Sequence, residues 1–123
     1  QKYTTSYFVR FNLVKVVKDI EYYNLLNGRY PDAISQIRDF EDIYKIDDYA
    51  KSGICAYEFY YYLHKDKNKY ILRSVGEDQK LFTNDDLVPD IDLTNTSNLG
   101  LIKTYDSKYE YPDNYCNPLQ WNA

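Results

Sequence analysis

The chain has 123 residues, of which 44% are apolar and 28% charged, and its net charge is −4. This length is expected for one domain with a hydrophobic core, so we predict a single domain over residues 1–123. The acidic balance argues against a nucleic-acid partner, because phosphate binding leaves a basic surface. No stretch of the sequence approaches the ~20 apolar residues of a membrane span.

An amphipathic helix is predicted over residues 6–27. Its apolar residues recur at spacings of three and four, and the central ones are Leu13, Val16, Val17 and Ile20. This spacing places them on one face, which we expect to pack on a sheet. Ser6 is the expected N-cap, and Gly28 is expected to end the helix in the left-handed conformation. Phe8 and Phe11 are expected to stay exposed, because a helical segment upstream of Gln1 would be their natural neighbour.

The rest of the chain predicts a short second helix and then strands. Asp32 is the expected cap of a helix that runs through Phe40. Residues 56–64 and 69–75 are rich in β-forming side chains and flank the polar turn 65–68, which predicts an antiparallel hairpin. A further strand is expected within residues 99–105. The order of elements predicts an α+β fold, with the N-terminal helix packed on a small antiparallel sheet.

Two cysteines, Cys55 and Cys116, lie far apart in the sequence. An even count with this spacing fits one disulfide formed in an oxidising compartment. Such a bridge would tether the tail, residues 93–123, to the sheet. The alternative is a pair of unrelated thiols.

An acidic loop is predicted between Glu77 and Asp92, with six acidic residues and one lysine. Carboxylate and carbonyl oxygens suit Ca²⁺, and the absence of nearby Cys and His disfavours zinc or iron. The spacing does not match an EF-hand. Charge alone therefore leaves two interpretations open, a calcium site and a solvated acidic loop.

Two short runs resemble a known family. Asn27-Gly28-Arg29-Tyr30-Pro31 follows the helix, and Ser74-Val75-Gly76-Glu77-Asp78 precedes Thr83-Asn84-Asp85-Asp86-Leu87. In this order they resemble the major pseudopilin of type II secretion systems, a type IV pilin-like family. The resemblance implies a pilin-like fold whose helix continues upstream into a hydrophobic half that is absent from this chain.

The family's calcium ligands can be carried over by position. The resemblance implies a Ca²⁺ site formed by the carbonyl of Val75, the carboxylates of Asp78 and Asp85 and an oxygen of Thr83. Asp86 would either bind the ion or only neutralise charge. The chain departs from the family at Lys51–Cys55, where a different turn is usual, and in its longer tail.

The resemblance implies a non-enzymatic structural subunit of a pilin-like or pseudopilin-like assembly, as part of a secretion system. Its partners would be other pilin-like subunits or copies of itself. It would lie outside the cytoplasm, in the periplasm or at the cell surface, and contact the membrane only through the missing N-terminal segment. The alternative is a secreted or surface-anchored module that binds a glycan or peptide through exposed tyrosines.

Two other features were weighed for chemistry. His64, the single histidine, is expected to be a surface residue at a strand end, because no nucleophile motif accompanies it. The run from Tyr57 to Tyr62 could stack against sugars, but core and cross-strand packing explains it more simply.

Overall fold

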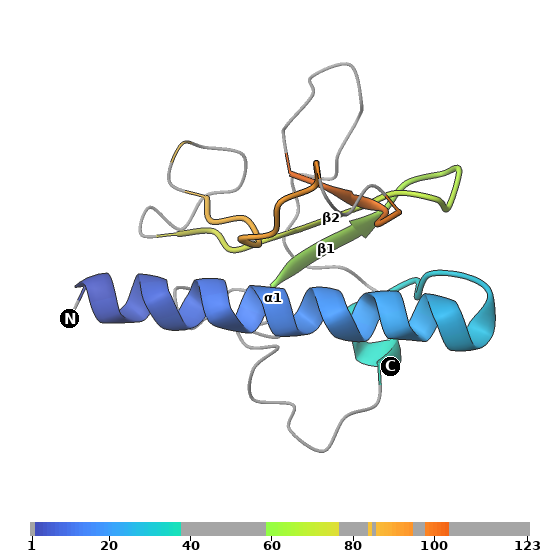
Figure 1. The fold of residues 1–123 in the computed structure, drawn as a ribbon, viewed down its shortest axis with the longest axis horizontal. Helices are drawn as coiled ribbons and strands as arrows, with labels where there is room; N and C mark the ends of the chain where they lie inside the picture. The colour runs from blue at the N-terminus through green and yellow to red at the C-terminus, as the bar shows by residue number, and fades with distance from the viewer. Residues whose placement is uncertain (1, 38–58, 77–83, 85, 95–97, 104–123) are drawn as a thin grey trace.

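The computed structural model describes residues 2–37, 59–76, 84, 86–94 and 98–103. The elements in chain order are α1 (Lys2–Asn27), the 3-10 helix η1 (Ile34–Gln36), β1 (Tyr60–Leu63), β2 (Tyr70–Arg73) and β3 (Leu101–Ile102). A long helix runs along one side of a small sheet, and η1 lies beside its C-terminal turns (Figure 1). The predicted α+β class is therefore confirmed.

Helix α1 is longer than expected at its start and ends where the sequence predicts. It begins at Lys2, so Ser6 lies within the helix and the prediction that Ser6 caps it was wrong. At the other end Gly28 has φ of 74° and donates its N–H to the Asn24 carbonyl at 2.8 Å. This single bond to a left-handed residue is a common helix stop.

The predicted hairpin is present. β1 and β2 pair antiparallel, with Tyr61 opposite Leu72 and Leu63 opposite Tyr70. The polar turn between them has Lys67 at φ of 63°, and the Asp66 carboxylate accepts a 3.0 Å bond from the Asn68 N–H. Side chains that bond their own backbone in this way are typical of turns.

The expectation of a wholly antiparallel sheet was wrong, because β3 pairs with β2 in parallel, Tyr70 opposite Leu101. The strand order is β1-β2-β3, so β2 is central. A parallel neighbour needs a long crossover, which residues 74–100 supply. The sequence pattern of a two-residue strand does not specify its direction.

The predicted second helix was also partly wrong. Only η1 forms, and Ile37 is already extended, with φ of −81° and ψ of 114°. Ala33, rather than Asp32, is the residue before η1, and it makes no side-chain cap. Instead the Gln36 side-chain oxygen accepts the Asp32 N–H at 2.7 Å. The remaining residues of the predicted helix, 38–40, lie outside the described part of the chain.

The core lies between α1 and the sheet. The predicted stripe of Leu13, Val16, Val17 and Ile20 is at most 1% exposed, as expected. It packs in one cluster with residues of η1 and all three strands or their flanks, which include Ile34, Phe59, Tyr61, Tyr70, Leu72 and Leu101. Burial of these apolar surfaces is the main force that holds the helix on the sheet.

Candidate functional site

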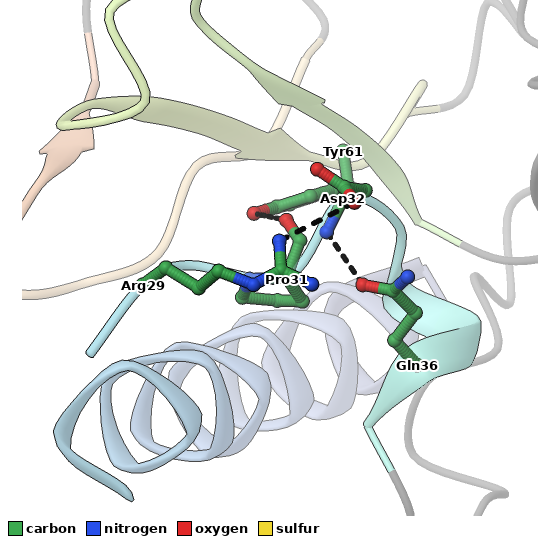
Figure 2. Close-up of polar contacts among 5 residues, drawn as sticks. All are labelled: Arg29, Pro31, Asp32, Gln36 and Tyr61. Atoms are coloured by element: carbon green, nitrogen blue, oxygen red, sulfur yellow. Dashed lines mark hydrogen bonds and ion pairs between the residues drawn. The ribbon is translucent and has the colours of Figure 1, made fainter. Parts of the chain in front are cut away.

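The turn that follows α1 is fixed on the sheet by polar contacts. The Tyr61 hydroxyl donates to the Pro31 carbonyl at 2.6 Å (Figure 2). Figure 2 also shows Arg29 directed at Asp32, an exposed ion pair of 3.4 Å. The first of the two family-like runs therefore forms a turn that docks on β1. Its attachment depends on a buried tyrosine hydroxyl rather than on the exposed ion pair, since exposed pairs contribute little.

A polar cluster centred on Glu21 joins α1 to the sheet and to the turn. The Glu21 carboxylate accepts hydrogen bonds from the hydroxyls of Tyr30 at 2.9 Å and Tyr70 at 2.8 Å. The Gly100 N–H lies 3.0 Å from the Tyr30 hydroxyl oxygen and 3.3 Å from Glu21 Oε2. Charge-assisted bonds of this kind are stronger than neutral ones, so this cluster fixes the position of α1 along the sheet.

The tyrosines of this cluster titrate at unusually high pH. Burial raises the pKa of Tyr30 to about 12, and the bond to Glu21 and the charge of that carboxylate act in the same direction. Burial raises the pKa of Tyr70 further, and the Glu21 charge adds to the effect. Both rings are therefore neutral donors over the physiological range, which suits structure better than acid–base chemistry.

The base of the acidic loop is closed by a buried ion pair and a backbone pair. Arg73 Nη1 and Asp86 Oδ2 lie 3.1 Å apart, and their side chains are 5% and 3% exposed. Arg73 Nη2 also donates to the Lys103 carbonyl at 3.3 Å. Ser74 and Leu87 exchange backbone hydrogen bonds of 2.9 and 3.2 Å. Two residues inside the predicted acidic loop, Asp86 and Leu87, are thus attached to the end of β2 and the residue after it without an ion.

Two of the five predicted calcium ligands belong to the described residues. Val75 is buried beside Gly76, and Asp86 is held by Arg73. The other three, Asp78, Thr83 and Asp85, lie outside them. Within the described residues no three His, Cys, Asp or Glu side chains are grouped as a metal site requires. The calcium site therefore stays a prediction.

The disulfide also stays a prediction, because both Cys55 and Cys116 lie outside the described residues.

Two sequence interpretations concerned the aromatic strand. His64 is 6% exposed, so the expectation of a surface histidine was wrong. Burial lowers its pKa, and its ring lies 5.6 Å from that of Tyr62. Phe59, Tyr60 and Tyr61 are at most 4% exposed, which confirms packing for this part of the run and removes these rings as a stacking platform.

An exposed apolar surface lies on the side of α1 turned away from the core, which we call the outward face. Its exposed apolar residues are Tyr7, Phe8, Phe11, Tyr22, Leu25 and Leu26, and each is at least 50% exposed. Their positions are roughly opposite the core stripe on the helical wheel. Exposed apolar patches are typical of interaction sites. The expected exposure of Phe8 and Phe11 is confirmed.

A pocket of about 430 Å³ borders the C-terminal part of the outward face. Tyr22, Tyr23 and Leu26 line it from α1, and Gln36 and Ile37 line it from the η1 side. Its polar lining residues are Asp19, Asn27 and Gln36. It extends the outward face as a recess.

The C-terminal half of the outward face was not predicted. Leu25, in this half, is 78% exposed. The signal that could have identified the face is a second periodic series through residues 8, 11, 15, 18, 22 and 25, with alternating steps of three and four. This second series overlaps the core stripe in sequence, and two of its positions are lysines. For both reasons it is not recognisable as an apolar face from the sequence pattern.

Comparisons with family models, with curated proteins and with solved structures found no match to the chain. In the part of the chain that the structure describes, no helix has both the length and the apolar character needed to cross a bilayer. The likeness to the major pseudopilins therefore depends on the sequence runs alone, and what it implies about function is a proposal.

Proposed function

We propose that the chain is a structural, non-enzymatic subunit of a pilin-like or pseudopilin-like assembly of a secretion system. The observation that carries this proposal is the outward face of α1. Six large apolar side chains stay exposed along a helix whose other side is firmly attached to the sheet. Exposing so much apolar surface is unfavourable for an isolated subunit, and packing against a neighbour removes that cost.

The way α1 is anchored supports this role. The core stripe, the Glu21 cluster and the docked turn after Asn27 fix the helix at three levels along its length. A rigid helix loses little conformational entropy when it binds, so preorganisation favours association. Other pilin-like subunits or copies of this chain are the proposed partners, outside the cytoplasm. The calcium-bound acidic loop belongs to the same proposal as a stabilising feature.

The alternative of a ligand-binding module gains less support. Of the described tyrosines of the strand, Tyr60 and Tyr61 are buried and Tyr62 is half-buried. The pocket beside Tyr22 lies on the outward face rather than on this strand.

The assembly proposal is tested in the complete protein in the cells that make it. The variant Phe8→Gln/Phe11→Gln/Tyr22→Gln/Leu25→Gln removes apolar surface without touching the core. We expect the unchanged protein to sediment as a large assembly in gently lysed cells and the variant to sediment as a small species. Urea unfolding of the isolated domain should differ little between them, because exposed positions contribute little to stability.

A matched control is Lys65→Gln/Lys67→Gln/Lys69→Gln on the hairpin turn, whose three side chains are exposed. It should assemble like the unchanged protein. An unchanged protein that sediments only as a monomer, or a helix variant that assembles normally, would contradict the proposal.

A further inference from the structure

His64 closes the turn between β1 and β2. It directly follows β1, its N–H donates to the Lys69 carbonyl at 2.9 Å, and its carbonyl accepts the Lys67 N–H at 2.8 Å. Lys67 has φ of 63°, a left-handed backbone that is unfavourable for a residue with a side chain. The bonds made by the His64 backbone therefore hold together a turn that contains an unfavourable residue.

The side chain of His64 anchors this turn to the interior. It is 6% exposed, whereas the five residues that follow it, 65–69, are all exposed. Its ring lies 5.6 Å from the ring of Tyr62 on β1. Removing an ionised group from water is costly, so this buried position suits the neutral imidazole and disfavours the imidazolium.

Two charged side chains of the turn act on this ring in opposite directions. The Asp66 carboxylate favours the imidazolium, and the Lys69 ammonium disfavours it. Burial is the largest influence, and the net result is a pKa of His64 below its ordinary value of about 6.5. The Asp66 carboxylate also accepts the Asn68 N–H at 3.0 Å, so it belongs to the structure of the turn itself.

A lowered pKa means that the closed turn favours the neutral ring of His64. Above about pH 6.5 the ring is neutral whether the turn is open or closed, and the closed turn has its full stability. As the pH falls below this value, the open turn takes up a proton that the closed turn binds less readily, so the open form becomes more populated. Histidine is the side chain whose ordinary pKa places this change near neutral pH.

We propose that protonation of His64 opens the hairpin turn, residues 64–69, and leaves the rest of the β1–β2 pair intact. The ring moves into water, and the two hydrogen bonds that its backbone makes within the turn are lost. Opening stops at the strands, because Tyr61 and Leu72, which lie opposite each other in the pair, are at most 2% exposed in the core. This acid-sensitive turn goes beyond the proposed assembly function and does not depend on it.

The test uses NMR, because His64 is the single histidine of the chain and its ring signals are unambiguous. We expect the ring to titrate below about pH 6.5. From about pH 7 to about pH 5, the protection of the Lys67 N–H against hydrogen exchange, corrected for the intrinsic rate, should fall at least about threefold. The Ser74 N–H, bonded to the Leu87 carbonyl beyond the other end of β2, is the internal control and should keep its protection.

Three variants separate the charge of the ring from its packing. His64→Gln cannot take up a proton, so the Lys67 N–H should be equally protected at both pH values. Asp66→Asn keeps an oxygen for the Asn68 N–H but removes the negative charge, so titration of the ring and opening of the turn should both shift to lower pH. Lys69→Gln should shift both to higher pH. A purely structural role for the ring predicts no such link between titration and opening.

Several results would overturn the inference. These are a His64 pKa at or above about 6.5 in the folded chain, a ring that titrates while the Lys67 N–H keeps its protection, and an equal loss of protection at Ser74, which would mean unfolding of the whole chain. A His64→Gln chain that still loses protection at Lys67 in acid would also overturn it. If His64→Gln does not fold, Asp66→Asn and Lys69→Gln decide: opposite shifts support the inference, and any other pair of results contradicts it.

Discussion

Asp86 is the residue for which structure and sequence suggest different roles. Its carboxylate faces Arg73 on the central strand, and both side chains are almost fully buried. We expect Asp86→Ala to lower the free energy of unfolding by about 3–5 kcal/mol, because it leaves a buried guanidinium without its counter-charge. Urea unfolding measures this loss. Asp90→Ala, at an exposed position, is the matched control and should cost under about 0.5 kcal/mol.

The pair also allows a cycle of variants. Replacing both partners, Arg73→Met with Asp86→Leu, removes both charges together and should recover most of the loss of Asp86→Ala. A double variant as unstable as the single one would show that Asp86 acts through contacts other than Arg73.

The buried tyrosines predict a pH dependence at the alkaline end. The pKa of Tyr30 is about 12 in the folded chain, against about 10 for an exposed tyrosine. A pKa that is higher in the folded state means that folding favours the protonated ring. This contribution is complete below about pH 10 and is lost as the pH rises through 12.

We therefore expect the free energy of unfolding to fall steeply above about pH 10. Urea unfolding at a series of pH values measures it. The free energy of unfolding of Tyr30→Phe should fall less steeply with pH than that of the unchanged chain. Tyr22→Phe changes a ring that is 60% exposed, so its pH dependence should match that of the unchanged chain. Identical curves for all three chains would contradict the assignment to Tyr30.

Replacing either of two glycines at element ends by alanine should lower the free energy of unfolding, but by different amounts. A methyl group on Gly28 would meet no atom within 4 Å, but the residue has φ of +74°, so Gly28→Ala should cost about 1–2 kcal/mol. A methyl group on Gly100 would lie 2.6 Å from the Asn68 carbonyl oxygen. Backbone cannot rotate away as a side chain can, so Gly100→Ala should cost about 3 kcal/mol. Thermal unfolding of both variants gives the order, and a smaller loss for Gly100→Ala would contradict it.

At the level of elements, features that local sequence patterns determine were predicted correctly, and features that depend on contacts between distant residues were not. The spacing of the core stripe and the glycine after Asn27 predicted α1, and the polar turn predicted the hairpin. The helix after Asp32 was overestimated, because the backbone at Ile37 is already extended where the apolar spacing suggests that the helix continues. The parallel direction of β3 arises from a crossover, which no short sequence pattern encodes.

The same distinction applies to the candidate site. Exposure of Phe8 and Phe11 followed from their place on the helix. The pairing of Ser74 with Leu87, which lies inside the predicted acidic loop, was not predicted. The partner of Asp86 did not follow from sequence, because Arg73 is exposed or buried according to what covers β2. Likewise Glu21 looks like a surface charge on α1 until Tyr30 and Tyr70 fold onto it.

At the scale of the whole molecule, α1 has two working faces. One face packs on the sheet through the core stripe, and the other, the outward face, carries the exposed apolar residues. Within the described part of the acidic loop, Asp86 contacts Arg73 of β2, and Leu87 pairs with Ser74, the residue after β2. None of these residues belongs to the outward face. Assembly through α1 and ion binding in the loop can therefore be tested independently.

The calcium site predicts a gain in stability of the whole domain. The base of the loop is already closed by Arg73 and Asp86, so the ion would act on the remaining carboxylates, Asp78 and Asp85, whose mutual repulsion it neutralises. Ca²⁺ that binds only the folded chain stabilises it by about 2.7 kcal/mol at a hundredfold excess over the dissociation constant. Thermal unfolding in millimolar calcium should therefore occur at a higher temperature than unfolding in EDTA.

The variants separate the ion from the ion pair. Asp85→Ala should unfold at the same temperature in calcium and in EDTA, close to the unchanged chain in EDTA, because it removes a ligand that the resemblance implies and leaves the loop base intact. Asp86→Ala should lower the unfolding temperature in both solutions, because Arg73 loses its counter-charge whether or not the ion is bound. Asp90→Ala should retain the full calcium effect. An unchanged chain whose unfolding temperature is the same in calcium and in EDTA would contradict the site. The acidic loop would then be a solvated surface, attached to the sheet by the Arg73–Asp86 ion pair and the Ser74–Leu87 backbone bonds.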